Sequence, residues 1–260
     1  LEAGNINITI DEEFEMKMSG SPINDMINSS EAITEAYYEA VDSIKELAIT
    51  RGEKLNLMNA AQKVRNDKLI EEITPFINTD PALIFMNAYY NLFTIEEITH
   101  LRSLLTTESL EKRTPTMERG EKKPIGTYVT DTKIPNLEGD SISLMSVIES
   151  YEYTLIDFWA SWCGPCIRSI PEVKEIYSKY KSEDFEIIAV SLDREYSEWK
   201  NAVERYNFEW VNLSNLQAWK SPCVQEYSIL YIPLKVLVDR EGKVISRNPT
   251  AEELDIYLSK

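Results

Sequence analysis

The feature that most constrains the fold is a mostly apolar run, residues 154–159 with Asp157 inside it, that ends shortly before Cys163-Gly164-Pro165-Cys166. A short, mostly apolar run is typical of a strand that is buried on both faces. Apolar residues at helical spacing follow the second cysteine as far as Tyr180, with Pro171 among them. We therefore expect a buried strand, a short loop, and a helix that begins just after Cys163 and bends at Pro171.

The rest of residues 124–260 alternates between strand patterns and helix patterns. A hairpin is expected from Ile134 to Leu144, and further helices at 196–206 and 251–258. The remaining expected strands are 185–192, 210–213, 234–238 and 243–246, the last two joined by the turn at 239–242. This order predicts an α/β fold, with a parallel core sheet, an antiparallel edge and helices packed on it.

The first half of the chain has a different pattern. Period-two alternation in the first twenty residues predicts a short β hairpin. Residues 22–112 then show helical spacing, with cap signals at Ser21-Pro22, Asp80-Pro81 and Thr94-Ile95-Glu96-Glu97. We expect a mostly α-helical domain, with a separation at Gly52 and a short helix from Asp80 through Leu92, and a break at 28–30 stays open.

A linker is expected between these two halves. Residues 113–126 are mostly polar and charged and contain Pro115, Gly120, Pro124 and Gly126. We therefore divide the chain into a helical domain, 1–123, and an α/β domain, 124–260.

Charge and hydropathy restrict the classes of partner that the chain can bind. The formal net charge is −17, which argues against nucleic acid and anionic lipid. No apolar run approaches the ~20 residues that cross a bilayer, and no signal peptide is visible. Because the chain begins at Leu1 without a Met, this says nothing about its compartment, and an anchor upstream of Leu1 stays open.

The chain has three cysteines and a single histidine. This is neither a dense disulfide framework nor a set of ligands with zinc-site spacing. We expect no metal and no cofactor. Cys223, which is remote from the pair in sequence, is interpreted as a small, buried apolar residue.

A C-x-x-C pair at the start of a helix suits thiol–disulfide exchange. A free cysteine has a pKa of about 8.5, and backbone N–H groups and the helix dipole at a helix N-terminus lower it. A fall of two units would be worth about 2.7 kcal/mol of thiolate stabilisation. We assign Cys163 as the nucleophile and Cys166 as the shielded resolving thiol, with Gly164-Pro165 fixing the turn between them.

At this point a family resemblance becomes specific. Residues 155–166, LIDFWASWCGPC, resemble the active-site segment of thioredoxins. WKSPCVQEY at 219–227, Ile232-Pro233 and VLVDREG at 236–242 are similar to the TlpA/ResA-like thiol-disulfide oxidoreductases of bacterial cell envelopes. The resemblance covers residues 124–260 and implies a thioredoxin fold. The helical half resembles, more loosely, the poorly characterised domain that precedes such modules in some envelope proteins.

The resemblance implies further site residues. Asp157 stands at the position of the family's buried carboxylate, which would accept and return the proton of Cys166. Pro233 matches the cis-proline opposite the dithiol, which would let the backbone of Ile232 pair with an extended substrate. Trp162 matches the tryptophan that shapes the rim of the site. The substrate-contacting residues are then expected to be Trp162, Gly164, Pro165 and Ile232.

The sequence therefore predicts a protein-disulfide reductase of the bacterial periplasm or cell envelope, acting on protein disulfides and recharged by an upstream electron donor. The reducing direction follows from the Gly-Pro dipeptide, which in this family accompanies stable disulfide forms. Two alternatives stay open. One is a disulfide oxidase or isomerase, and the other is a client-binding or sensing module in which the dithiol is secondary.

Overall fold

The computed structural model describes residues 7–10, 16–19, 21–89, 92–111, 124–181, 184–227, 229 and 231–259. Its contacts divide the chain into two compact units, each described by itself below. The first comprises Leu1–Tyr89 and Thr99–Arg113, and the second Tyr90–Ile98 and Thr114–Lys260. Most of the expected linker, 113–126, lies outside the described residues.

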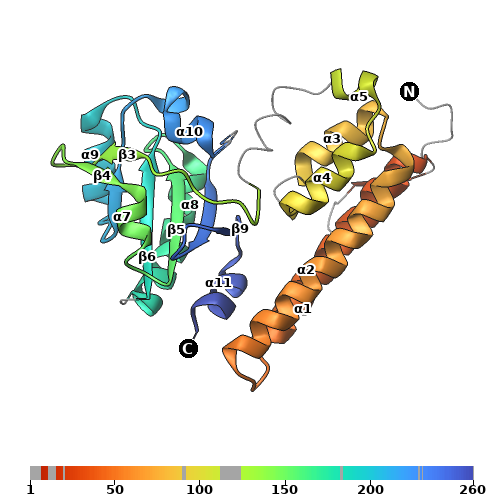
Figure 1. The fold of residues 1–260 in the computed structure, drawn as a ribbon, viewed down its shortest axis with the longest axis horizontal. Coiled ribbons are helices and arrows are strands. Elements are labelled where there is room, and N and C mark those ends of the chain that lie inside the picture. The colour runs from red at the N-terminus through yellow and green to blue at the C-terminus, as the bar shows by residue number, and fades with distance from the viewer. Residues whose placement is uncertain are drawn as a thin grey trace. The chain divides into compact units, whose positions relative to one another are not determined.

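A long helical hairpin dominates the first unit (Figure 1). Its two antiparallel helices are α1 (Pro22–Lys45) and α2 (Arg51–Ile73). Ser21 caps α1 as expected, since its side chain accepts a hydrogen bond from the Asn24 N–H at 3.2 Å. The buried residues of α1 follow helical spacing, so a single stripe faces the partner helix: Met26, Ser30, Tyr37, Val41 and Ile44.

The structure decides two points about this hairpin. The break left open at 28–30 is absent, since Ser30 Oγ donates within the helix to Met26 O at 2.7 Å and Ser29 Oγ donates to Glu72 at 2.9 Å. Gly52 does not separate the helices either. It lies inside the first turn of α2, which begins after a capping box formed by Thr50 and Glu53.

The rest of this part of the chain consists of short elements. The hairpin expected at the start is confirmed as β1 (Asn7–Ile10) paired antiparallel with β2 (Met16–Ser19). The helical elements after α2 are η1 (Thr74–Phe76), α3 (Asp80–Tyr89), α4 (Ile95–Ser103) and α5 (Thr107–Glu111). Leu92 lies outside α3, which is shorter than expected. The Thr94 capping box is confirmed, since Thr94 N–H donates to Glu97 at 2.8 Å.

The second unit is built on a five-stranded mixed sheet in the order β7-β6-β5-β8-β9 (Figure 1). Its strands are β5 (Tyr153–Trp159), β6 (Phe185–Ser191), β7 (Val211–Leu213), β8 (Leu234–Asp239) and β9 (Val244–Arg247). β5, β6 and β7 run parallel, and β8 and β9 form the expected antiparallel edge. Every residue of β6 is buried, as its mostly apolar sequence predicts.

The remaining elements of this unit surround the sheet. Ahead of β5 come the hairpin of β3 (Lys133–Pro135) and β4 (Ser141–Ser143), and α7 (Leu144–Ile148). The others are α8 (Gly164–Tyr180), α9 (Tyr196–Arg205), η3 (Ala218–Lys220), α10 (Pro222–Glu226) and α11 (Ala251–Leu258). α8 packs on β6 and on α11. This is the thioredoxin-like α/β architecture that the sequence predicts, preceded by a mostly helical region.

Candidate active site

The two cysteines lie where the central strand gives way to the long helix. β5 ends at Trp159, and Cys163 occupies the N-cap position of α8. The Cys166 N–H donates to Cys163 Sγ at 3.1 Å, and the two sulfurs are joined in a disulfide. Cys163 Sγ is therefore held against the free N–H groups of a helix N-terminus, where a thiolate formed on reduction is stabilised.

The dithiol is more enclosed than the sequence suggests. Cys163 is only 4% exposed and Cys166 only 3% exposed, although an attacking cysteine is expected to be accessible. The neighbouring Trp162, Gly164 and Pro165 are exposed. The exposed surface next to the two buried sulfurs is therefore formed by these neighbours.

Asp157 lies on β5, two residues before the strand ends at Trp159, and is buried. Burial raises the pKa of its carboxyl above the usual range, and the Lys235 cation lowers that pKa by a smaller amount. Asp157 Oδ1 has no hydrogen-bond partner within the described part of the chain. Such a carboxyl can take up a proton at a pH where an exposed aspartate stays ionised.

Pro233 lies at the same end of the sheet as the dithiol loop. Phe158 of β5 pairs with Leu234 of β8, so Pro233 immediately precedes a residue level with the end of β5. The Ile232–Pro233 peptide bond is cis, as the family resemblance implies. Ile232 and Pro233 are both partly exposed, so a substrate backbone can approach this edge.

A carboxylate that sequence reasoning missed lies beneath the dithiol loop. Asp193 is fully buried and accepts hydrogen bonds from Ser161 N–H at 3.0 Å, Ser161 Oγ at 2.6 Å and Ser191 Oγ at 2.6 Å. Ser161 follows β5 and Asp193 follows β6. Because adjacent parallel strands end at the same edge, the two expected strands already placed these residues near each other.

A cleft of about 290 Å³ opens beside the dithiol loop. It is lined by Trp162, Leu192, Arg194, Glu198, Ala218 and Trp219. Of these, only Trp162 is among the predicted site residues. The others come from the segment after β6, from α9 and from η3, which are far apart in sequence from the cysteines.

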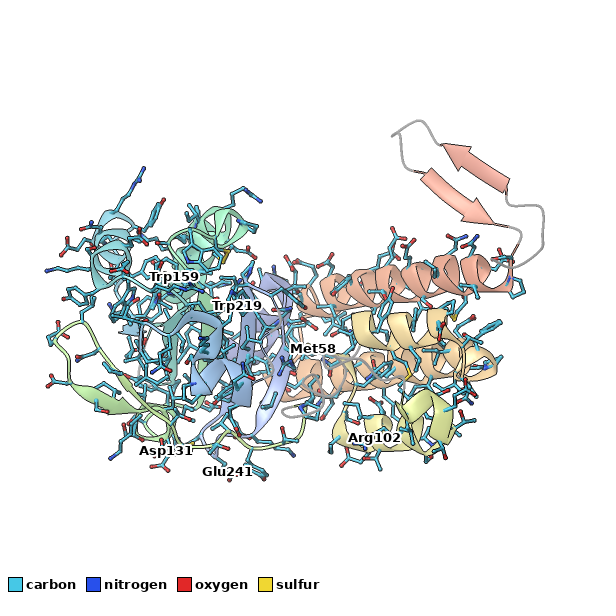
Figure 2. All side chains as sticks on the ribbon, turned by 90° about the horizontal axis from the view of Figure 1, so that it is seen from above. Met58, Arg102, Asp131, Trp159, Trp219 and Glu241 are labelled. Atoms are coloured by element: carbon cyan, nitrogen blue, oxygen red, sulfur yellow. A yellow bond between two sulfur atoms is a disulfide. The ribbon has the colours of Figure 1, made fainter. Side chains whose placement is uncertain are left out.

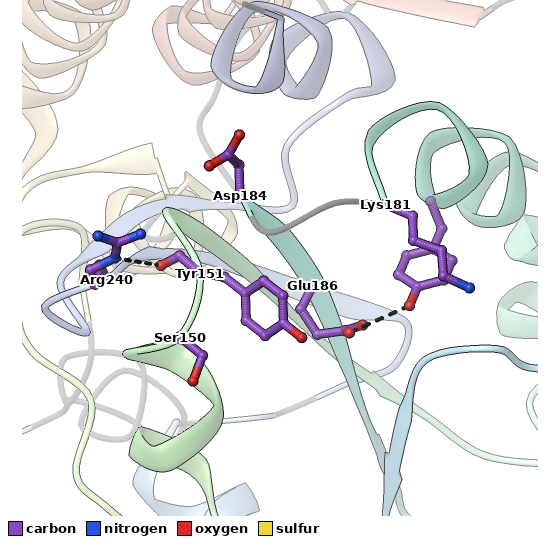
Figure 3. Close-up of a pocket in the computed structure, with 7 residues that line it drawn as sticks. Ser150, Tyr151, Lys181, Asp184, Glu186 and Arg240 are labelled. Atoms are coloured by element: carbon purple, nitrogen blue, oxygen red, sulfur yellow. Dashed lines mark hydrogen bonds between the residues drawn. The ribbon is translucent and has the colours of Figure 1, made fainter.

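A larger cleft, of about 570 Å³, lies at the opposite end of the sheet (Figure 3). In it the Tyr177 hydroxyl donates to Glu186 at 3.4 Å, and Arg240 Nε donates to Tyr151 O at 3.3 Å. Glu186 is the second residue of β6, whereas the dithiol follows the last residue of the parallel neighbour β5. This mixed-charge cleft is therefore separate from the dithiol.

Three further features of the described residues bear on function: metal ligands, membrane-spanning helices and the third cysteine. They contain no group of three or more side chains placed to hold a metal ion. None of the described helices is both long and apolar enough to cross a membrane. The third cysteine, Cys223, is 0% exposed, and burial raises the pKa of its thiol far above the usual range.

Comparison with known proteins decides the family. A family model described as thioredoxin-like matches residues 151–244. The chain is 31% identical over 143 residues to the thiol-disulfide oxidoreductase ResA of Bacillus thuringiensis subsp. konkukian. The alignment covers 54% of this chain and 80% of the relative. The chain belongs to the ResA-like thiol-disulfide oxidoreductases of the thioredoxin superfamily.

Other thiol-disulfide oxidoreductases match about half of the chain. The ResA of Bacillus anthracis is 31% identical over 144 residues, again 54% of this chain and 80% of the relative. A solved thiol-disulfide oxidoreductase from Bacteroides fragilis is 27% identical, covers 49% of this chain and 94% of its own, and superposes with a TM-score of 0.47.

Proposed function

We propose that this oxidoreductase reduces disulfide bonds of proteins outside the bacterial cytoplasm. The observation that carries the proposal is the position of Cys163 Sγ at the N-cap of α8, with Cys166 bonded to it from the first turn. The Gly164-Pro165 dipeptide between them and the resemblance to envelope oxidoreductases support the reducing direction and the compartment.

The first step forms a mixed disulfide. The Cys163 thiolate attacks one sulfur of the client disulfide, a new S–S bond forms, and the other client sulfur leaves as a thiolate that takes a proton from solvent. The helix N-terminus assists because it favours the anionic form of Cys163 before attack. Partly exposed Ile232 and Pro233 would support the client backbone during this step.

The second step releases the client. The buried Asp157 carboxylate accepts the Cys166 proton, and the resulting thiolate attacks Cys163 Sγ. The Cys163–Cys166 disulfide forms, and the second client sulfur leaves as a thiolate and is protonated. The client has then gained two electrons and two protons, and a dithiol donor must reduce the chain again.

The redox potential tests the direction. Equilibration of the Cys163–Cys166 pair with glutathione buffers should give a potential near that of thioredoxin, about −270 mV. A potential near that of DsbA, about −120 mV, would mark an oxidant and contradict reduction as the physiological direction.

The compartment has its own test. Antibody detection in cell fractions of the bacterium that encodes the chain should place the protein with envelope markers. Recovery with cytoplasmic markers alone would refute the envelope role without affecting the exchange chemistry.

A further inference from the structure

The cleft beside the dithiol is joined to the reacting atoms through the backbone. Trp162, one of its walls, directly precedes Cys163. Leu192, also in its lining, donates its N–H to Trp159 O at 2.8 Å, which ties this wall to the end of β5. A chain segment that places its sulfur at Cys163 therefore passes within a residue or two of this cleft.

The lining selects an apolar, planar group. Trp162 is 53% exposed and Trp219, labelled in Figure 2, is 37% exposed. Single exposed apolar residues are ordinary on a protein surface, but two tryptophans that line one cleft are not. Arg194 and Glu198 bring opposite charges to the lining, so the cleft favours neither an acidic nor a basic side chain.

The size of the cleft suits a single side chain. Pockets for drug-sized ligands measure roughly 300–1,000 Å³, and this cleft lies just below that range at about 290 Å³. It can hold an amino-acid side chain from a docked segment. Tryptophan is also among the residues that most often anchor protein partners, because its large flat surface loses little conformational entropy on binding.

The second wall is held in place by an unusual backbone. Leu216 and Ala218 have φ of 55° and 49°, a left-handed conformation that side chains other than glycine disfavour. Ser214 Oγ accepts the Leu216 N–H at 3.2 Å and donates to Ser191 O at 3.0 Å, which fastens this turn to the end of β6. Trp219 is thereby presented at a fixed place beside the dithiol loop.

We propose that the cleft between Trp162 and Trp219 receives an aromatic side chain adjacent in sequence to the client cysteine that Cys163 attacks. The proposal rests on the proposed function and adds a substrate class to it: protein disulfides flanked by an aromatic residue. Docking of that side chain would compensate for the small exposure of Cys163, because it holds the client sulfur close to the recessed nucleophile.

The test uses the full chain in its dithiol form and short Gly/Ser peptides closed by one disulfide. Each peptide carries either Phe or Ala at one position flanking the first cysteine. The rate of peptide reduction is followed by the tryptophan fluorescence of the protein. At the position that reaches the cleft, Phe should accelerate reduction about tenfold over Ala, a ratio that corresponds to about 1.4 kcal/mol.

Protein variants test whether the cleft causes the faster reduction of the Phe peptide. For each variant, the rate for the Phe peptide is divided by the rate for the Ala peptide. Trp219→Ala should bring the ratio close to one, whereas Tyr128→Ala, which removes an exposed aromatic residue outside the cleft lining, should keep it. If Trp219→Ala does not fold, Glu198→Lys is the alternative variant, since Glu198 is an exposed residue of the cleft lining. A further peptide then carries Glu at the flanking position. Glu198→Lys should reduce this Glu peptide faster, relative to the Ala peptide, than the unaltered chain does.

Two outcomes overturn the inference while leaving the proposed function intact. One is reduction of every Phe peptide at the rate of its Ala counterpart. The other is a Phe/Ala ratio that Trp219→Ala leaves unchanged or, where that variant does not fold, a Glu/Ala ratio that Glu198→Lys leaves unchanged. If no peptide is reduced at all, the proposed function itself fails, and the substrate class fails with it.

Discussion

Asp157 and Lys235 face each other as paired residues of the antiparallel strands β5 and β8. The pairing sets a buried acid against a partly exposed cation. Burial raises the pKa of the Asp157 carboxyl, and the positive charge of Lys235 offsets only part of that rise. Under the proposed function, the pair would set the pH at which Asp157 accepts the Cys166 proton.

Replacement of Asp157 by Asn should slow the resolving step and stabilise the fold. General acid–base catalysis is typically worth at least about 100-fold, so resolution of a mixed disulfide at neutral pH should slow by about that factor. Because the folded pKa lies above the unfolded value of about 3.9, stability falls as pH rises between the two values. Asp157→Asn should therefore unfold at a higher temperature than the unaltered chain at pH 8, and the difference should vanish below about pH 4.

Replacement of Lys235 should shift the pH profile of the same step. Lys235→Met removes the cation, so the pKa of Asp157 should rise further and the midpoint of the resolution rate should move to higher pH. Lys235→Arg keeps the charge and should keep the midpoint. Stopped-flow measurement of resolution from pH 4 to pH 9 checks this, and identical midpoints for the Met and Arg variants would contradict it.

The roles of the three cysteines predict distinct trapping results. Cys166→Ser should accumulate mixed disulfides with clients, because Cys163 can attack but nothing resolves the product. Cys163→Ser should trap nothing. Adding Cys223→Ser to the trapping variant should change neither the yield nor the identity of clients, because Cys223 is buried and its raised pKa keeps it a thiol. Non-reducing gels with mass spectrometry read the result, and client adducts on Cys223 would contradict it.

Removal of the buried Asp193 carboxylate should destabilise the dithiol loop. Asp193→Ala leaves Ser161 and Ser191 without their acceptor and should lower the free energy of unfolding by about 3 kcal/mol. Ser161→Ala, which removes one donor and keeps the backbone bond, should cost about 1.5 kcal/mol. Urea unfolding measures both, with Asp140→Ala as the control for an exposed carboxylate. Equal stability of Asp193→Ala and Asp140→Ala would show that the hydrogen bonds from Ser161 and Ser191 to Asp193 do not stabilise the fold.

The sequence predicts the second unit well because its signals are local. The mostly apolar sequences of β5 and β6 reflect burial on both faces. The turn between β8 and β9 requires glycine at Gly242, where φ is 79° and an added Cβ would lie 2.9 Å from Val129 Cγ2. The residue types at these positions therefore indicate the local structure directly.

The features that sequence reasoning missed depend on contacts between distant segments. The helix around Ser29 and Ser30 continues because Ser29 meets Glu72 from the second helix. Asp193 and Trp219 are far from the cysteines in sequence. They lie near the dithiol loop only because of the way the strands are ordered in the sheet. No local pattern reveals them, although the expected parallel pairing of β5 with β6 places Ser161 and Asp193 at one edge.

The proposed domain boundary predicts that residues 124–260 fold and exchange disulfides without the helical region. The start of this segment is tied to its own sheet, since Gly126 N–H donates to Val244 O and Val244 N–H donates to Thr127 O, both at 2.8 Å. Within the described part of the chain, truncation breaks one backbone hydrogen bond, from Ile95 N–H to Ile125 O at 3.1 Å, which should cost about 1 kcal/mol. Urea unfolding of the truncated and full chains measures this cost, and reduction of a small disulfide measures the activity. A truncated chain that is unfolded or inactive would place the boundary nearer residue 90.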